Sequence, residues 1–424
     1  MQILSSPGIL PGLERIQKLL QEMGNPHEGQ RYVHIAGTNG KGSTAFMISA
    51  ILKQAGCRVG RFISPHIHSY RERFTINDAP IEEQLLLNYI NLMEEKIMAL
   101  QEQGFTSAPT EFEILTAIAL QYFNDSQADI AVMEVGMGGL YDSTNVITPL
   151  VAVITGIDYD HSFFLGGTLE EIAANKAGII KHKVPTVAGP MDNRALKVIE
   201  NQAAEKESPL CHSSRVQVTS KSQPGIQGRY LDIKTSSFTM KDFFFPLLGE
   251  YQIQNLATVL TAVMVLKDNG IYINEEYFRT ALSTLIIPGR LEITRHNPPV
   301  VLDAAHNPQA AEALANSLKE LFPARKKVLL CGVLDDKDAQ NILSPLTEET
   351  RAFIFTKPEG SRNKHWQRLE SICRNLCPGR EIYSEEDIYN AVEKGLNLIR
   401  EDEFLLITGS YYVLDRARRY LTKD

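Results

Sequence analysis

A glycine-rich segment near the N-terminus contains the residue types that bind phosphate. Residues 34–44 read His-Ile-Ala-Gly-Thr-Asn-Gly-Lys-Gly-Ser-Thr and lie between a predicted strand over 32–36 and a predicted helix over 41–55. Glycines let backbone N–H groups turn inward around an anion, and a helix N-terminus adds partial positive charge. Lys41 is placed to pair with β- and γ-phosphates. The spacing is not a strict Walker A motif, because Gly42 displaces the hydroxyl to Ser43. We predict a phosphate-binding loop rather than a glycine turn with an exposed lysine.

Two further predicted strands run into polar residues. The strand over 130–135 carries Glu134 near its end, and the strand over 150–157 is followed by Asp158, Asp160 and His161. Ligands of open α/β sheets gather at the carboxyl ends of strands, so Glu134 is well placed to hold a metal ion. A helix cap, a solvated strand end or a structural histidine would give the same pattern, and these residues alone leave the choice open.

Lys176 stands in unusually apolar surroundings for a lysine. Its sequence neighbours include Ala173, Ala177, Ile179 and Ile180. Such surroundings favour the neutral amine, and a neutral amine can react with CO2. The motif indicates either a functional lysine or a structural one.

A second group of candidate residues lies in the last third of the chain. Residues 300–308 read Val-Val-Leu-Asp-Ala-Ala-His-Asn-Pro. Pro308 suits the first position of a helix and Asn307 its N-cap. Asp303 then lies at the end of a strand, either as part of a site or as a cap of the turn. His66, His68, Arg71 and Arg73 form a weaker candidate, for which a plain surface loop is the alternative.

Short apolar strands alternate with amphipathic helices along most of the chain, which favours an α/β fold with largely parallel sheets. An amphipathic helix opens the chain and ends at Gly24, and capping boxes at Thr110 and Thr168 open two later helices. The segment 214–248 is expected to form short strands. A break near Pro288 divides the chain into predicted domains of residues 1–287 and 288–424. The second domain is expected to contain strands over 299–304, 327–333, 351–356 and 404–408 and helices over 308–321, 337–343, 361–376, 385–400 and 412–421.

Composition excludes several classes of protein. The 424 residues are 43% hydrophobic and 22% charged, with a formal net charge of −8, which disfavours a nucleic-acid-binding protein. No apolar run approaches the ~18 residues of a membrane span, and the first residues lack the features of a signal peptide. Five scattered cysteines are typical of reduced thiols in the cytoplasm.

Taken together, these segments resemble the folylpolyglutamate synthase and dihydrofolate synthase family of the Mur-ligase superfamily. The resemblance covers nearly the whole chain, and its specificity lies in the order and spacing of its motifs. These motifs are residues 34–43, 62–66, 110–113, 134–139, 142–145, 160–161, 176–180, 288–292 and 302–308. It implies a P-loop-containing, mostly parallel-sheet ATPase domain followed by a smaller, Rossmann-like α/β domain.

The resemblance also implies a reaction, an ATP-dependent amide ligation that adds L-glutamate to a folate, with dihydropteroate as a second acceptor. The γ-phosphate of ATP activates a substrate carboxylate as an acyl phosphate, which the amine of glutamate attacks. Because the transition states carry spreading negative charge, Mg²⁺, lysine and arginine supply most of the stabilisation. The implied partners are these small molecules, with no nucleic acid and no membrane, and the implied state is a cytoplasmic monomer.

The family's site residues carry over onto matching positions of this chain. The ATP contacts are implied to be Gly37, Thr38, Asn39, Gly40, Lys41, Gly42, Ser43, Asn255, Arg290 and Asp303. The ligands of two Mg²⁺ ions are implied to be Ser64, Glu134, His161 and Lys176, the last as a carbamate. The pterin site is implied to include Thr110, Phe112 and Asp142. The catalytic set is implied to be Lys41, Lys176, Asp303 and His306, with the role of His306 left open.

The chain departs from the family pattern at two places. Leu140 and Tyr141 occupy the segment where the family usually has an arginine, and Asn175 stands where the residue before the lysine is usually acidic. A ligase for cell-wall peptides is disfavoured, because only 36 residues precede Gly37. The alternative from another class is a P-loop kinase or a nucleotide-regulated binding protein that forms no amide.

Overall fold

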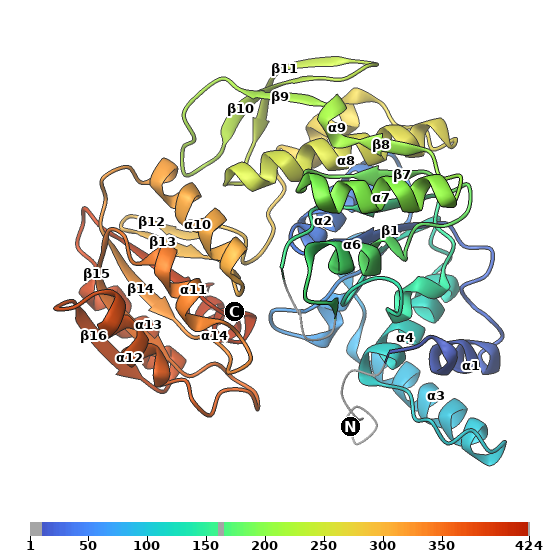
Figure 1. Ribbon diagram of the computed structural model, residues 1–424, viewed down its shortest axis with the longest axis horizontal. Coiled ribbons are helices and arrows are strands. Elements are labelled where there is room, and N and C mark those ends of the chain that lie inside the picture. Colours follow the sequence, from blue (N-terminus) through green and yellow to red (C-terminus); the bar gives the residue numbers. More distant parts are fainter. Residues whose placement is uncertain (1–10, 160–164, 423–424) are drawn as a thin grey trace. The chain divides into compact units, whose positions relative to one another are not determined.

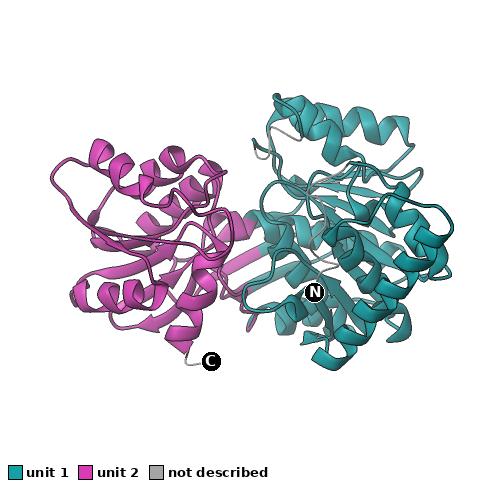
Figure 2. Ribbon diagram, turned by 90° about the horizontal axis from the view of Figure 1, so that it is seen from below, with its two compact units in different colours: residues 1–218, 233–241, 254–283 teal, residues 219–232, 242–253, 284–424 magenta. Residues whose placement is uncertain are grey.

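The computed structural model describes residues 11–159 and 165–422 (Figure 1). Contacts within the chain define two compact units, coloured separately in Figure 2. We call residues 1–218, 233–241 and 254–283 the N-terminal unit, and residues 219–232, 242–253 and 284–424 the C-terminal unit. The predicted domain boundary between residues 287 and 288 stays a prediction.

The N-terminal unit is built on a sheet that, within the described residues, has eight strands in the order β4-β3-β2-β5-β1-β6-β7-β8. Strands β2, β5, β1, β6, β7 and β8 pair in parallel, and β3 and β4 add an antiparallel edge. The central strand β1 is buried along its whole length, as expected of a parallel sheet covered on both faces. The strands are β1 Tyr32–Ala36, β2 Val59–Phe62, β3 Phe74–Ile76, β4 Ala79–Pro80, β5 Ile130–Glu134, β6 Val151–Ile154, β7 Thr186–Ala188 and β8 Leu210–His212.

Helices of this unit pack in groups, with α1, α3 and α4 in contact with one another and α6 against α7 (Figure 1). The predicted capping boxes are confirmed, since the Thr110 side chain accepts from the N–H of Glu113 and the Thr168 side chain from that of Glu171. The predicted opening helix is α1, whose buried face is Ile16, Leu19 and Leu20. The helices are α1 Glu14–Glu22, α2 Lys41–Gln54, α3 Glu83–Glu102, α4 Glu111–Asp125, α6 Leu169–Ala177, α7 Asn193–Glu205, α8 Glu250–Asp268, whose first residues belong to the C-terminal unit, and α9 Glu275–Leu282.

The C-terminal unit contains a second sheet, which in the part of the chain described has the order β12-β13-β17-β14-β15-β16. Its strands are parallel except for β12, and apolar clusters lie on both of its faces. This is the smaller α/β unit that the sequence predicts. Its elements are β12 Glu292–His296, β13 Pro299–Leu302, α10 Pro308–Leu321, β14 Lys327–Cys331, α11 Ala339–Leu343, β15 Thr350–Thr356, α12 Arg368–Leu376, β16 Glu381–Glu385, α13 Ile388–Leu398, β17 Phe404–Thr408 and α14 Tyr411–Thr422.

The segment 214–248 forms the predicted short strands, in a sheet of order β11-β10-β9. They are β9 Gln217–Ser220, β10 Arg229–Lys234 and β11 Thr239–Phe245. Among the described residues, no helix combines the length and the apolar character needed to cross a membrane.

Two predicted helices of the C-terminal unit are wrong in part. The helix expected over 361–376 begins only at Arg368. The helix expected over 385–400 begins at Ile388, after the N-cap Asp387, because residues 381–385 form β16. Within the described residues, strand β16 pairs on one side only, with β15, and it is partly exposed. It therefore lacks the continuous apolar run that identifies the inner strands.

Candidate functional site

The predicted phosphate loop joins the central strand β1 to helix α2, and its glycines are required by their surroundings. Gly37 has φ +152° and Gly40 has φ +85°. A Cβ atom on Gly37 would lie 2.0 Å from Oγ1 of Thr155, and one on Gly40 would lie 2.4 Å from Oδ1 of Asn255. Asn255, implied as a nucleotide contact, is therefore packed against the loop.

Hydrogen bonds fasten this loop to the residues that follow β6. Thr155 Oγ1 donates to the carbonyl oxygen of Asn39 at 2.7 Å. Thr38 Oγ1 accepts from the N–H of Asp158 and donates to its carbonyl oxygen, both at 3.0 Å. Lys41 Nζ donates to the carbonyl oxygens of Gly37 and Thr38 at 3.1 and 3.2 Å, so its ammonium group lies against the loop. Hydrogen bonds within the protein therefore fix the conformation of the loop without a ligand.

Glu134 brings a buried carboxylate to the same end of the sheet. Glu134 is the last residue of β5 and is 4% exposed. Oε2 of Glu134 accepts from the backbone N–H of Ser64 at 3.1 Å, and a Cβ on Gly42 would lie 3.7 Å from the same oxygen. A carboxylate and a hydroxyl-bearing residue beside a phosphate loop supply the hard oxygen ligands that Mg²⁺ prefers.

The described residues contain only part of the implied set of magnesium ligands. His161 lies outside the described residues. Within the described residues, no three or more histidine, cysteine, aspartate or glutamate side chains gather as they would in an all-protein metal cage. Magnesium typically uses only one or two carboxylates together with substrate phosphates, so Glu134 and Ser64 fit a magnesium site of that kind.

Lys176 is in contact with the phosphate loop. The residue is 3% exposed in α6, and its Nζ donates to the carbonyl oxygen of Gly37 at 2.9 Å. The two positions at which the chain departs from the family pattern are in contact beside Lys176. The N–H of Leu140 donates to the carbonyl oxygen of Asn175, the residue before Lys176, at 2.8 Å. No spacing in the sequence indicates that Leu140 and Asn175 are in contact.

A cavity of about 460 Å³ opens in the N-terminal unit and contains the three residues implied for the pterin site, Thr110, Phe112 and Asp142. The ring of Phe112 lies on the backbone of Gly136, where an added Cβ would come within 2.5 Å of it. Apolar side chains form much of the wall, with polar groups between them. The other lining residues include Ser64, Arg73, Glu111, Met137, Tyr141, Ser143, Leu165 and Asn175.

The carboxylate of Asp142 is held from several sides. Oδ1 accepts from the N–H of Thr144 at 3.0 Å and from its hydroxyl at 2.5 Å, and Oδ2 accepts from the N–H of Met137 at 2.9 Å. Burial raises the pKa of Asp142, and these hydrogen bonds act in the opposite direction. Asp142 therefore presents an acceptor of fixed orientation to the cavity.

The C-terminal unit contains the other implied nucleotide contacts. Asp303 follows β13 and is 4% exposed. Its carboxylate accepts from the N–H groups of Leu291 and Ala305, each at 2.9 Å, and from the hydroxyl of Tyr251 at 3.4 Å. Burial raises the pKa of Asp303, whereas the charge of Arg290 lowers it. Asp303 thus caps its turn, which is one of the two roles that the sequence predicts for it. It also orders the segment that carries Arg290.

Tyr411 connects Arg290 with His306. Arg290 donates to the Tyr411 hydroxyl and its guanidinium carbon lies 5.5 Å from the centre of the Tyr411 ring. The His306 ring centre is 5.8 Å from that of Tyr411, and Nδ1 of His306 pairs with the carbonyl oxygen of Ala304 at 2.9 Å. Since a carbonyl only accepts, Nδ1 carries the proton.

Tyr251 and Tyr411 were not among the predicted site residues. Tyr411 directly follows the loop after strand β17, so the rule that ligands gather at carboxyl ends of strands could have identified it. Tyr251 lies one helical turn before Asn255 in α8, but nothing in its spacing indicates a contact with Asp303.

Comparison with known proteins gives consistent results along nearly the whole chain. Residues 35–263 match the Mur ligase middle domain, and residues 289–411 match the Mur ligase glutamate ligase domain. The dihydrofolate synthase/folylpolyglutamate synthase of Bacillus subtilis is 37% identical over 98% of this chain and 96% of its own length.

Solved structures agree with this result. The folylpolyglutamate synthase of Mycobacterium tuberculosis complexed with ADP superposes with a TM-score of 0.93 at 31% identity, covering 100% of this chain and 97% of that one. The E. coli FolC structure in complex with DHPP and ADP superposes with a TM-score of 0.86 at 27% identity, covering 99% and 95%. The chain therefore belongs to the folylpolyglutamate synthase and dihydrofolate synthase family of the Mur ligases.

Proposed function

We propose that this protein is an ATP-dependent ligase that adds L-glutamate to folates and also to dihydropteroate. The observation that carries the proposal is the arrangement of the N-terminal unit, in which Lys176 donates to the phosphate loop and the cavity contains Thr110, Phe112 and Asp142. The Bacillus subtilis relative is named for both activities.

The proposed reaction begins with ATP on the loop of residues 37–43, with Lys41 paired to its phosphates. Asn255, Arg290 and Asp303 are the other proposed nucleotide contacts. The carboxylate of the acceptor attacks the γ-phosphorus, which gives an acyl phosphate and ADP. The amine of glutamate then attacks the acyl carbon, and inorganic phosphate leaves as the amide bond forms. We assign Lys41 and Arg290 to counter the negative charge that develops in these steps. His306 belongs to the proposed catalytic set with its role left open.

Two magnesium ions are part of this proposal. Ser64, Glu134 and His161 would hold one ion, and Lys176, as a carbamate, would help to hold a second. When bound, the ions neutralise charge on the phosphate oxygens. The buried carboxylate of Glu134 beside Ser64 and Gly42 supports the first site.

The carbamate on Lys176 is supported by the burial of this lysine and by its contact with the loop. Carbamylation leaves one hydrogen on the nitrogen, so the hydrogen bond to Gly37 can persist. Crystals grown with bicarbonate should show a carboxylate added to Nζ. Density that ends at an unmodified amine under these conditions would count against the carbamate.

The acceptor is proposed to bind in the 460 Å³ cavity. Phe112 offers a ring face for stacking on a flat heterocycle, and Asp142 offers an acceptor for its N–H groups. Arg73 lines the same cavity and supplies a local positive charge for an anionic ligand in a protein of net charge −8.

The deciding experiment measures phosphate release by the purified protein with ATP, Mg²⁺ and glutamate, and with dihydropteroate or tetrahydrofolate as the acceptor. We expect release that requires both glutamate and an acceptor, together with an amide product found by mass spectrometry. Silence with every pterin would overturn the proposed function. Phosphate transfer without amide formation would favour the alternative, a P-loop kinase or a nucleotide-regulated binding protein. A monomeric state and a cytoplasmic location belong to the same proposal.

A further inference from the structure

Three side chains from two distant parts of the N-terminal unit form a buried chain of hydrogen bonds that ends at the cavity. Nε2 of His34, in β1, lies 2.8 Å from Oγ1 of Thr144, and this oxygen lies 2.5 Å from Oδ1 of Asp142. His34 and Thr144 are 0% exposed and Asp142 is 7% exposed. The sequence separates His34 from Thr144 by 110 positions, so the contact is a product of the fold.

The chain of hydrogen bonds has one direction when Asp142 is ionised. A carboxylate can only accept, so the Thr144 hydroxyl donates its hydrogen to Asp142. The lone pair of the same hydroxyl then accepts from His34, which requires a hydrogen on Nε2. Because complete burial favours the neutral imidazole, the hydrogen on Nε2 leaves Nδ1 of His34 unprotonated. Among the described residues this Nδ1 has no hydrogen-bond partner, although it is fully buried.

Filling a core position would not require such a residue. The rest of β1, apart from Tyr32, is aliphatic, and an aliphatic side chain at position 34 would leave no polar atom unsatisfied in the interior. The polar atom that His34 does satisfy is the Thr144 hydroxyl, and Thr144 in turn makes two of the hydrogen bonds to Asp142. The buried histidine thus serves the orientation of one carboxylate in the cavity wall.

We propose that His34 and Thr144 are positioning residues that hold Asp142 as an acceptor for the N–H groups of a pterin ring. This inference rests on the proposed function, in which the cavity binds the acceptor substrate. It predicts that the two residues affect pterin binding without touching the ligand. His34 also lies three positions before Gly37 on the strand that leads to the phosphate loop. General damage to β1 would therefore weaken nucleotide binding as well.

The experiment is isothermal titration of the full-length protein with dihydropteroate and, separately, with ADP. His34→Leu removes the donor, and His34→Gln keeps an N–H at nearly the same place. Thr144→Val removes the hydroxyl, and Thr144→Ser keeps it. Thr186→Val is the matched control, because Thr186 is a 0% exposed threonine of the same sheet whose hydroxyl bonds to Ser208 at 2.8 Å, and it does not line the cavity.

We expect His34→Leu and Thr144→Val to weaken dihydropteroate binding about tenfold, the usual effect of losing a hydrogen bond that orients a charged group. His34→Gln, Thr144→Ser and Thr186→Val should stay close to the wild type, and ADP binding should change less than about twofold in all five variants.

Three results would overturn the proposal. The first is that Thr144→Val and His34→Leu bind dihydropteroate as strongly as the wild type. If His34→Leu does not fold, the affinity of Thr144→Val alone is the test. The second is a parallel loss of ADP binding, which would indicate a structural role. The third is a wild-type protein that binds no pterin at all, which would remove the proposed acceptor site together with this inference.

Discussion

Nζ of Lys176 donates a 2.9 Å hydrogen bond to the carbonyl oxygen of Gly37, the first residue of the phosphate loop. Helix α6 and the loop are 139 positions apart in the chain at this contact, and the lysine is almost completely buried. A change at Nζ therefore acts directly on the backbone that is proposed to surround the phosphates of ATP.

Replacing Lys176 with methionine should nearly abolish ligation. The variant loses the hydrogen bond to Gly37 and the nitrogen that would carry the carbamate, so we expect kcat for phosphate release to fall at least about 100-fold. Lys183→Met is the control, because Lys183 lies nearby in the sequence and its side chain is 67% exposed. Equal activity of Lys176→Met and Lys183→Met would contradict the assignment of Lys176 to the site.

Replacing Tyr251 with phenylalanine should weaken nucleotide binding by a smaller factor. The hydroxyl of Tyr251 lies 3.4 Å from Oδ2 of Asp303, so its loss removes one of the donors to that carboxylate. We expect the Kd for ADP to rise about threefold to tenfold, and to rise further for Asp303→Asn. Tyr272→Phe, at a residue that is 74% exposed, should leave the Kd unchanged. An unchanged Kd in Tyr251→Phe would show that this contact does not support Asp303.

Stability should fall in acid because of His34. Burial, with a smaller effect from the charge of Lys181, lowers the pKa of His34 from 6.5 to about 3. The unfolded chain therefore takes up a proton on His34 below pH 6.5 that the folded protein does not accept. The contribution of neutral His34 to the free energy of unfolding is thus fully present at neutral pH and declines towards pH 3. The loss should reach about 2 kcal/mol near pH 5, measured by urea unfolding. His34→Gln should lack this component of the pH dependence, and an identical pH profile in the variant would refute it.

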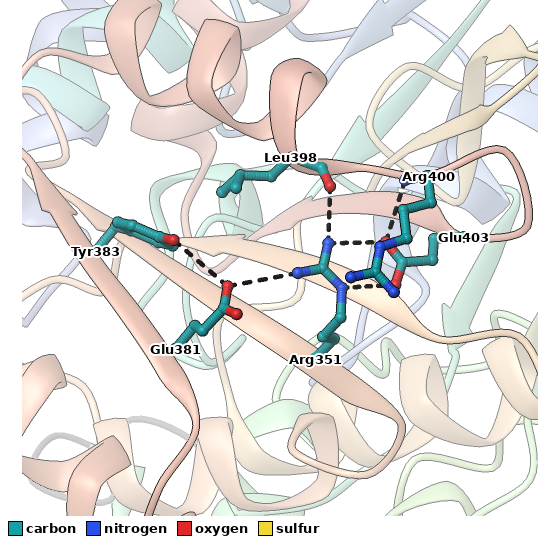
Figure 3. Close-up of polar contacts among 6 residues, drawn as sticks. All are labelled: Arg351, Glu381, Tyr383, Leu398, Arg400 and Glu403. Atoms are coloured by element: carbon teal, nitrogen blue, oxygen red, sulfur yellow. Dashed lines mark hydrogen bonds and ion pairs between the residues drawn. The ribbon is translucent and has the colours of Figure 1, made fainter.

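An ion pair in the C-terminal unit should contribute to stability but not to catalysis. Figure 3 shows Arg351 of β15 between Glu403 and Glu381, with hydrogen bonds of 2.6 and 2.9 Å to Glu403 and one of 2.7 Å to the carbonyl oxygen of Leu398. Burial acts to raise the pKa of Glu403, but the hydrogen bonds and charge of Arg351 outweigh it, so the pKa lies below its usual value. The side chain of Glu403 is only 2% exposed, so removing Arg351 alone would leave its carboxylate buried without a partner.

Arg351→Met should therefore destabilise the protein by about 3 kcal/mol at neutral pH, because it leaves a carboxylate buried without its partner. This loss should shrink as the pH falls through the pKa of Glu403, since the carboxyl group then becomes neutral. Arg362→Met breaks an exposed pair with Asp336 and should have little effect on thermal unfolding. Similar unfolding curves for both variants would contradict the prediction.

The parts of the molecule that follow from local rules could be predicted from the sequence. Asn307 and Pro308 start α10 as expected, with the Asn307 side chain accepting from the N–H of Ala310, and β1 and β17 have the predicted bounds. In these places the signal lies within a few residues. The partly exposed edge strand β16 was missed because neither of its faces has a continuous apolar pattern.

Contacts across long separations could not be predicted in the same way. The pairs His34–Thr144 and Tyr251–Asp303 depend on which strands and turns become neighbours, and no local spacing encodes this. The motifs did predict that the phosphate loop and Glu134 lie at the ends of strands, because parallel strands end at one edge of the sheet. The assignments of the individual ligands remain proposals.

The contact between Leu140 and Asn175 bears on selective inhibition. The family pattern implied by the resemblance has an arginine in the segment of Leu140 and Tyr141 and an acidic residue at position 175. Here the backbone N–H of Leu140 donates to the carbonyl oxygen of Asn175, an uncharged residue that lines the cavity. An inhibitor with an apolar arm directed at Asn175 would not have to strip water from a charged group, as it would in relatives that follow this pattern. A compound extended in this direction should inhibit this enzyme more strongly than a relative with an acidic residue at the position of Asn175.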